Sequence, residues 1–126
     1  MDIPQDLRYS PSHEWVRQEE DGSLAIGLTS HAQEALGDVI FLDLPQVGKA
    51  YKQEEVCGVI ESVKAASDIY TPVSGEILAV NTSAVEEPGQ VNEQPYQTWL
   101  FRIQPSDSSE LDKLLSPEEY VKLSDE

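Results

Sequence analysis

The apolar and polar positions along the chain predict a protein built mainly from short β-strands. Short apolar runs rich in Val, Ile and Leu are separated by clusters of Gly, Pro, Asp and Ser, a pattern typical of strands joined by turns. Strands are predicted at residues 13–16, 24–28, 39–44, 56–60 and 77–80. The pattern has no regular alternation of strands with long helices, so nothing in it indicates a nucleotide-binding fold.

Turn residues connect these strands. The pair Asp21-Gly22 predicts a tight hairpin turn between the first two strands, because glycine tolerates a positive φ. The last two apolar runs are uninterrupted, so both are expected to be strands buried on two faces. Between them, Pro72 and the pair Ser74-Gly75 predict a turn.

A short helix is predicted between the second and third strands. Ser30 and Gln33 have the spacing of a capping box, in which the first residue caps the helix. Gly37 is placed to end the helix in the left-handed conformation. The helix would have only about two turns.

Helical turns are also predicted near the C-terminus. Asp107 and Glu110 have capping-box spacing, and Ser116 with Glu119 repeats it. Pro117 suits the first helical position, where a missing N–H costs nothing. One helical face after the first start signal would carry Leu111, Leu114 and Leu115.

The segment Glu61-Ser62-Val63-Lys64-Ala65 is the clearest candidate for chemistry. It is a short break after an apolar run, and its lysine is expected to be exposed at the tip of a turn. Only a neutral amine forms an amide, so an enzyme that modifies this lysine must reach and deprotonate it. Val63 and Ala65 are small and uncharged and leave access open.

Length and charge restrict the functions that the chain can have. At 126 residues it forms about one domain, residues 1–126. With 24 acidic and 8 basic residues, the formal charge is −16, which argues against nucleic acid or an anionic membrane as a partner. The acidity either maintains solubility or steers the protein toward basic enzyme surfaces. We expect a monomer.

The single cysteine and the N-terminal residues indicate a cytoplasmic protein. Cys57 has no second cysteine to pair with and lies in an apolar run, where a thiol packs as a small hydrophobe. Residues 1–6 lack the features of a secretion signal or a transit peptide. A processed organellar protein with a new start methionine would look similar.

The lysine segment and much of the remaining chain resemble one family. Residues 61–65, followed by Pro72-Val73-Ser74-Gly75-Glu76, are similar to the lipoylation site of glycine cleavage H proteins. The same order continues in His13-Glu14-Trp15, Gly27-Leu28-Thr29, His31-Ala32-Gln33, Leu36-Gly37-Asp38, Leu44-Pro45, Asn81, Pro88, Val91-Asn92, Pro95-Tyr96 and Trp99. One departure is the glycine-free stretch from Pro95 to Trp99, where a tighter loop is expected.

This resemblance implies a fold and a function. The fold would be mainly β, a barrel-sandwich hybrid of the lipoyl- or biotinyl-carrier kind, with a short inserted helix and C-terminal helical turns. Lys64 would carry covalent lipoic acid as N6-lipoyllysine. The arm would take the aminomethyl group of glycine from one enzyme to the next in glycine catabolism and one-carbon metabolism. The carrier itself would be no enzyme, because the cofactor holds the chemistry.

The resemblance also implies the partners. They are glycine decarboxylase (P protein), the tetrahydrofolate-dependent aminomethyltransferase (T protein) and dihydrolipoyl dehydrogenase (L protein), which reoxidises the arm. A lipoyl or octanoyl transferase, or a lipoate ligase, would attach the cofactor. An alternative role is a lipoyl relay that passes the group to other complexes.

The resemblance assigns roles to residues around Lys64. Glu61, Ser62, Val63 and Ala65 would present the attachment hairpin to the modifying enzyme. Glu14 is our candidate for docking the loaded arm, since a carboxylate can pair with the ammonium of the cargo. The alternative is that Glu14 is an ordinary acidic residue on a solvated strand.

Rival interpretations lack the residues they require. A biotinyl carrier would need methionine on both sides of the lysine, where Val63 and Ala65 stand. A lipoyl domain cut from an acyltransferase would bring a flexible Ala/Pro linker. A hydrolase using His13 with Glu14 or Cys57 conflicts with the opposite directions of adjacent strand residues. No metal site is expected, because neither histidine has a second ligand at the usual spacing.

Overall fold

The structure is a computed structural model that describes residues 4–124. Two antiparallel sheets form the molecule, one of six strands and one of three. The large sheet contains β1 (Arg8–Tyr9), β2 (Glu14–Gln18), β3 (Leu24–Leu28), β9 (Phe101–Pro105), β8 (Gly75–Val80) and β5 (Ala50–Tyr51), in that spatial order. The small sheet contains β4 (Val39–Asp43), β6 (Val56–Ser62) and β7 (Ala66–Tyr70).

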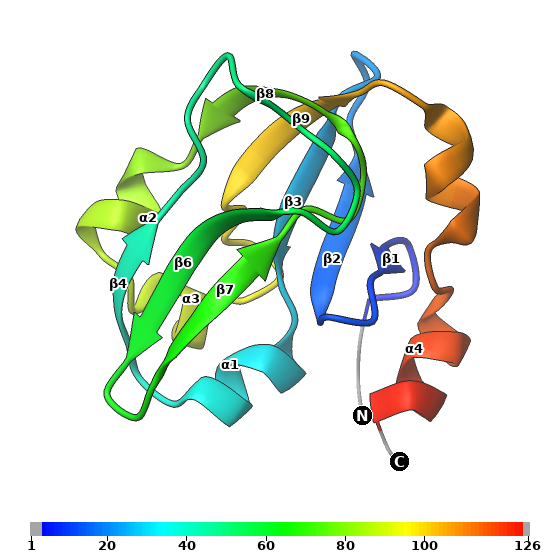
Figure 1. The fold of residues 1–126 in the computed structure, drawn as a ribbon. Helices are drawn as coiled ribbons and strands as arrows, with labels where there is room; N and C mark the ends of the chain where they lie inside the picture. The colour runs from blue at the N-terminus through cyan, green and yellow to red at the C-terminus, as the bar shows by residue number, and fades with distance from the viewer. Residues whose placement is uncertain (1–3, 125–126) are drawn as a thin grey trace.

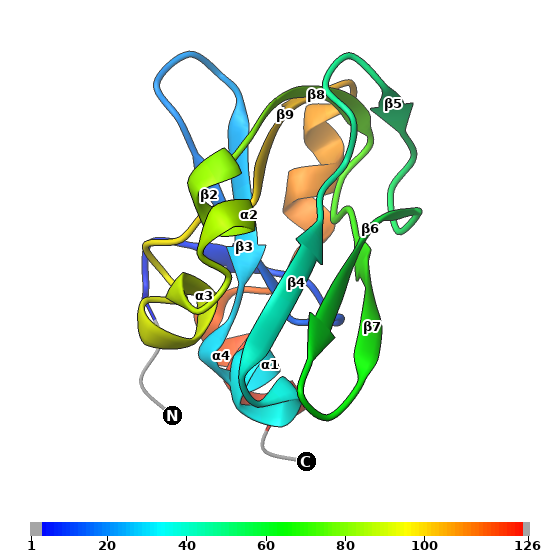
Figure 2. The ribbon, with the colours of Figure 1, turned by 90° about the vertical axis from the view of Figure 1, so that its left-hand side faces the viewer.

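Short helices close the ends of this arrangement. They are α1 (Ser30–Leu36), α2 (Thr82–Glu86), α3 (Gln90–Glu93), a 3₁₀ segment (Ser108–Lys113) and α4 (Pro117–Ser124). Figures 1 and 2 show α1 at the same end of the molecule as the turn between β6 and β7. Helix α4 lies beside β1, on the other side of the large sheet from the small sheet (Figure 1). The expected mainly β barrel-sandwich hybrid with a short inserted helix and C-terminal helical turns is confirmed.

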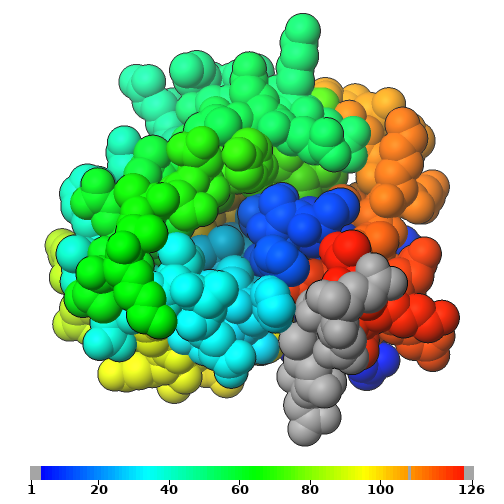
Figure 3. Space-filling model, turned by 60° about the horizontal axis from the view of Figure 1, so that its bottom comes forward, coloured from blue at the N-terminus to red at the C-terminus, as the bar shows by residue number. Residues whose placement is uncertain are grey.

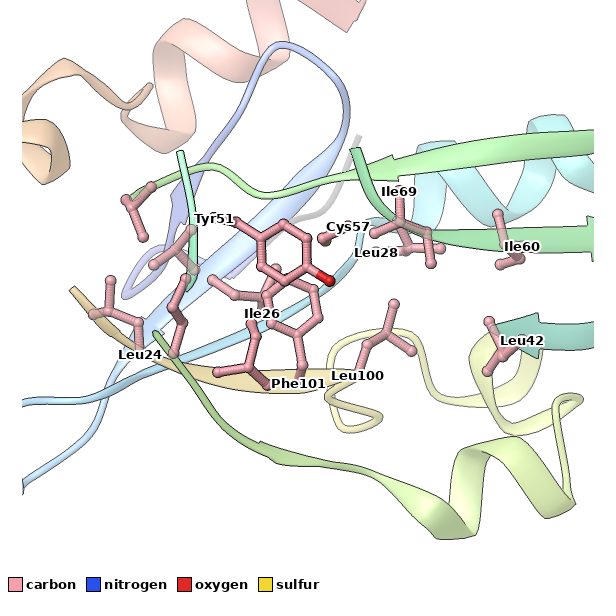
Figure 4. Packing of buried hydrophobic residues seen from close by; sticks show 14 of the residues in the cluster. Leu24, Ile26, Leu28, Leu42, Tyr51, Cys57, Ile60, Ile69, Leu100 and Phe101 are labelled. Carbon is pink, nitrogen blue, oxygen red and sulfur yellow. The ribbon is translucent and has the colours of Figure 1, made fainter. Parts of the chain in front are cut away.

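The main core lies between the two sheets. Figure 4 shows Leu42, Ile60 and Ile69 of the small sheet in one cluster with Ile26 and Phe101 of the large sheet. A second cluster lies on the opposite face of the large sheet and consists of Leu7, Tyr9, Trp15, Ala25 and Tyr120. Successive strand residues point to opposite faces, so the continuous apolar run of β3 supplies both clusters.

Two strands predicted to be buried on both faces are buried on only one. In β6, Cys57 and Ile60 point into the core, whereas Val56 is 44% exposed. In β8, Ile77 is buried and Leu78 is 42% exposed. An antiparallel sheet can leave one face in water, and an apolar run alone does not show which face that is.

Among residues 4–124, the sequence pattern missed the two-residue strands β1 and β5 as well as β7 and β9, and β7 is the one that borders the lysine segment. β7 pairs with β6 in an antiparallel hairpin, with Glu61 opposite Ala66 and Val59 opposite Asp68. β7 ends at Tyr70, just before the turn that was predicted at Pro72 and Ser74-Gly75. Three of the five residues of β7 are exposed, as an edge strand allows, so this segment lacks the apolar run that predicts a strand.

The helix starts were predicted in part. Thr29, one residue before the expected Ser30, caps α1, because its Oγ1 accepts from the Ala32 N–H (3.2 Å). Gly37 has the expected positive φ of 80°, with an extended ψ of −156°, and its N–H donates to the Gln33 carbonyl oxygen.

Of the two capping boxes predicted near the C-terminus, one forms in full and the other only in part. Asp107 caps the 3₁₀ segment by accepting from the Ser109 N–H, but Glu110 accepts from Ser74 instead of closing a capping box. Ser116 and Glu119 form the reciprocal capping box as predicted, and α4 begins at Pro117. Both signals therefore marked real helical segments.

Candidate functional site

Lys64 lies at the tip of the hairpin between β6 and β7, and Ser62 shapes that tip. Ser62 is 7% exposed, and its Oγ accepts from the N–H groups of Lys64 and Ala65, each at 3.2 Å. The Ser62 N–H donates to the Ala65 carbonyl oxygen (2.8 Å), and the Val63 N–H donates to the Asp38 carbonyl oxygen (3.0 Å). The turn is therefore fixed to its own strands and to the start of β4.

The side chains around Lys64 leave it accessible. Lys64, Ala65 and Glu61 are exposed, and Val63 is 64% exposed. Among residues 4–124, no carboxylate forms an ion pair with the Lys64 amine. The amine is thus available to a modifying enzyme.

The Lys64 stem lies over Gly37 at the end of α1. A Cβ added to Gly37 would stand 3.2 Å from Lys64 Cε and 3.4 Å from Cδ. Asn92 fastens this corner, since its Nδ2 donates to the Gly37 carbonyl oxygen (2.8 Å) and its Oδ1 accepts from the Val39 N–H (2.8 Å). The surface on which the stem rests is therefore held by α1, β4 and α3.

Glu14, the first residue of β2, is a buried carboxyl group with two hydroxyl partners. It is 1% exposed and accepts from Ser10 Oγ (2.7 Å) and Ser12 Oγ (2.6 Å). Burial raises the pKa of Glu14 to about 7, although the two serine hydrogen bonds act in the opposite direction. In the part of the chain that the structure describes, no cation is paired with it.

The chain before β2 turns sharply to form this environment. The Ser10 N–H donates to the Glu14 carbonyl oxygen (2.9 Å), and the His13 N–H donates to the Ser10 carbonyl oxygen (3.1 Å). His13 has a φ of 71°, a conformation uncommon for residues other than glycine. The turn directs the hydroxyls of Ser10 and Ser12 onto the Glu14 carboxyl group.

The surface is hollowed near this turn. Figure 3 shows a depression bordered by the green segment that holds β6 and β7, the cyan helix α1 and the blue residues of the N-terminal segment. Ser10 and Ser12 line a pocket of about 390 Å³ together with Tyr70, Thr71 and Lys113. The turn before β2 and the end of β7 therefore line the same pocket.

Helix α1 connects the two parts of the candidate site. Its C-terminal end, Gly37, lies under the Lys64 stem, and its N-terminal cap, Thr29, donates its N–H to the His13 carbonyl oxygen (3.1 Å). Seven helical residues rise about 10 Å. Lys64 and the Glu14 turn are therefore separated by about the length of this short helix.

The structure groups the residues singled out in the sequence into two sets. Glu61, Ser62, Val63 and Ala65 share the hairpin with Lys64, whereas Glu14 is on the large sheet. The sequence reasoning did not identify Ser10, Ser12, Gly37 and Asn92 as parts of the site. Val91-Asn92 and Leu36-Gly37 stood in the family pattern, but nothing in that pattern stated their contacts.

The residues that a hydrolase or a metal site would use have other roles in the structure. Cys57 is buried, and burial, followed by the neighbouring Glu14, raises the pKa of its thiol to about 12, which opposes thiolate chemistry. His13 Nδ1 contacts the Tyr120 hydroxyl (2.8 Å) and not Glu14. The described residues contain no group of three or more His, Cys, Asp or Glu side chains that could hold a metal ion. No helix within residues 4–124 is long and apolar enough to cross a membrane.

Comparison with known proteins identifies the family. The family model described as glycine cleavage H-protein matches residues 7–126. The chain is 52% identical over 125 residues to the glycine cleavage system H protein of Nitrosomonas europaea, covering 99% of this chain and 97% of that one. It is 53% identical over 121 residues to glycine cleavage system H protein 2 of Pseudomonas putida, covering 96% and 95%.

A solved structure agrees in fold. The crystal structure of a glycine cleavage system H protein from Mycobacterium marinum superposes with a TM-score of 0.89 at 39% identity, covering 98% of this chain and 100% of that one. The similarity in sequence and in structure therefore extends over nearly the whole chain, the lysine hairpin included. The chain belongs to the glycine cleavage H-protein family.

Proposed function

We propose that this protein is the lipoyl carrier of a glycine cleavage system, with lipoic acid in amide linkage to Lys64 Nζ. The observation that carries the proposal is an exposed lysine at the tip of a hairpin fixed by Ser62, in a chain of this family. Bound lipoate would supply a dithiolane that takes up and releases the aminomethyl group of glycine. The chain contributes presentation of the arm and protection of its cargo, and no catalytic step.

The residues around Lys64 suit attachment of such a group. The amine has no ion-pair partner among the described residues, and the Lys64 stem crosses a glycine that offers no side chain to obstruct it. A rigid turn with a free side chain lets a transferase or ligase recognise the shape of the hairpin. Ser62 sets that shape, Val63 and Ala65 keep it uncharged, and Glu61 offers an exposed carboxylate.

Glu14 is proposed to dock the loaded arm. Stem and lipoyl chain together reach roughly 14 Å by ordinary bond lengths, and α1 separates Lys64 from the Glu14 turn by about 10 Å. An ammonium group placed beside the buried Glu14 would favour its ionised form, which burial alone disfavours. A docked arm would also shield the aminomethyl cargo from water.

The partners follow from this role. The P, T and L proteins would load, unload and reoxidise the arm, and a lipoyl or octanoyl transferase or a lipoate ligase would attach it. The charge of −16 suits encounters with basic enzyme surfaces. We further propose that residues 1–126 act as one monomeric domain, and that a lipoyl relay to other complexes is the alternative use of the same arm.

Mass spectrometry of the protein purified from lipoate-replete cells tests the attachment site. We expect one lipoyl adduct, on the peptide that contains Lys64. Lys64→Arg should lack the adduct and fail to support glycine oxidation by added P, T and L proteins, since the arginine side chain stays protonated. Lys52→Arg, at another exposed lysine, should match the wild type. A Lys64→Arg protein that still supports glycine oxidation contradicts the proposal.

A further inference from the structure

One buried hydroxyl joins three parts of the chain next to the Glu14 turn. Tyr120 of α4 is fully buried, and its ring stacks on Tyr9 with centroids 4.7 Å apart. Its Oη lies 2.8 Å from His13 Nδ1 and 2.7 Å from Thr29 Oγ1. The C-terminal helix is thereby connected to the turn before β2 and to the start of α1.

The protons of this network can be assigned from its contacts. Thr29 is fully buried, and its Oγ1 already accepts from the Ala32 N–H (3.2 Å), so its own proton needs an acceptor. Tyr120 Oη is that acceptor, which leaves the Tyr120 proton for His13 Nδ1. His13 is then neutral, in agreement with a pKa lowered by burial and by the His31 ring 4.5 Å away.

The same histidine holds the unusual backbone of the turn. His13 has a φ of 71°, and its carbonyl oxygen accepts from the Thr29 N–H (3.1 Å). On either side of it in sequence, Ser12 and Glu14 form the 2.6 Å hydrogen bond of the carboxyl site, and Ser10 adds the second at 2.7 Å. The His13 ring is therefore attached to the same turn that carries the two hydroxyls bound to Glu14.

We propose that Tyr120 is a positioning residue for the carboxyl site of Glu14. Its hydroxyl holds the His13 ring and so the turn that places Ser10 and Ser12 on the Glu14 carboxyl group. This inference rests on the proposed docking role of Glu14 and extends it to the C-terminal helix. Among the described residues, the titratable groups that face this region are Cys57 of β6, the histidines His13 and His31, and the tyrosines Tyr9, Tyr96 and Tyr120.

The conservative variant Tyr120→Phe tests the inference in the unlipoylated full-length chain. It keeps the ring stack and removes only the hydroxyl. Tyr96→Phe is the matched control, because the Tyr96 hydroxyl contacts Ser30 and not His13. We expect the Glu14 carboxyl titration, followed by ¹³C NMR, to shift by about half a pH unit or more in Tyr120→Phe only. An unchanged Glu14 titration in Tyr120→Phe overturns the inference.

The lifetime of the loaded, lipoylated protein gives the second readout. Tyr120→Phe should shorten it by about fivefold, the factor associated with one lost hydrogen bond, and Tyr96→Phe should not. Where Glu14→Gln shortens the lifetime, a wild-type lifetime in Tyr120→Phe also overturns the inference. Glu14→Gln separates the two proposals: if its lifetime equals that of the wild type, the docking role fails. The Glu14 titration then decides the role of Tyr120 alone.

Discussion

Glu14 shows how strongly one residue can be constrained by its surroundings. A carboxyl group that is 1% exposed and has only hydroxyl partners is easier to keep neutral than charged. The resemblance to the family was enough to single out Glu14 and Lys64. The hydroxyls of Ser10 and Ser12 could not be predicted, because their approach depends on the positive φ of His13.

Glu14 should make stability depend on pH. Its pKa is about 7 in the folded chain against 4.5 unfolded, so the folded state binds the additional proton between these values. Raising the pH from about 4.5 to 7 therefore removes stability, by up to about 3 kcal/mol. Glu14→Gln should be more stable than the wild type at pH 8 and nearly equal at pH 4.5, measured by urea unfolding. Glu76→Gln, on the surface, is the control, and an equal gain at both pH values contradicts this explanation.

Gly37 should tolerate substitution less well than another glycine with a positive φ. Gly37 combines φ 80° with ψ −156°, a region almost restricted to glycine, and Lys64 lies against it. Gly22 has φ 88° and open space around it. We expect Gly37→Ala to lower the free energy of unfolding by about 2–3 kcal/mol and Gly22→Ala by about 1 kcal/mol. Only Gly37→Ala should also slow lipoylation of Lys64; equal lipoylation rates would argue against the stem contact.

At the scale of elements, local sequence signals located the helical segments, whereas the exact caps and the strand pairing depended on tertiary contacts. The capping box of Ser116 and Glu119 is local, and it marked the start of α4. The start of α1 was misplaced by one residue, because Thr29 is selected by a buried contact with Tyr120 as well as by its cap. β7 was missed, since its pairing with β6, rather than its own apolar content, makes it a strand.

The observed cap of α1 predicts that Thr29 contributes more to the stability of the fold than its neighbour Ser30 does. Thr29→Ala removes the α1 cap and a buried hydroxyl contact, so it should lower the free energy of unfolding by about 2 kcal/mol. Ser30→Ala loses a hydroxyl contact with Tyr96 at the edge of the site and should lose about 1 kcal/mol or less. Thermal unfolding of the two variants measures the difference. A larger loss of stability in Ser30→Ala than in Thr29→Ala would indicate that Ser30 is the cap.

At the scale of the whole molecule, two sheets share one core. Ile60 of the small sheet and Phe101 of the large sheet belong to the same buried cluster, so the small sheet has its core only together with the large sheet (Figure 4). The pattern of strands predicted a mainly β chain, and the family resemblance implied the barrel-sandwich hybrid. It could not give the division into two sheets, because strands far apart in sequence, such as β3 and β9, pair through contacts that no local pattern encodes.

The shared core predicts a single unfolding transition. Ile60→Ala should lower the free energy of unfolding by about 3 kcal/mol. With Trp99 replaced by Phe, so that Trp15 is the one remaining tryptophan, Trp15 fluorescence should report the same shift as far-ultraviolet circular dichroism. Trp15 lies on the large sheet, away from Ile60, so it reports whether the sheets unfold together. Val47→Ala, at an exposed position, should change little. A Trp15 transition unaffected by Ile60→Ala would show that the sheets are independent units.

The strand order β4-β6-β7 leaves β7 at an edge, directly after the lysine. Its free backbone groups could pair with the same strand of a second molecule, which would enclose both lysines in an extended sheet. Antiparallel pairing of two such strands centred on Asp68 would set two exposed carboxylates opposite each other, an arrangement that like charges oppose. Asp68 would therefore oppose this one pairing of β7 with a second copy of itself.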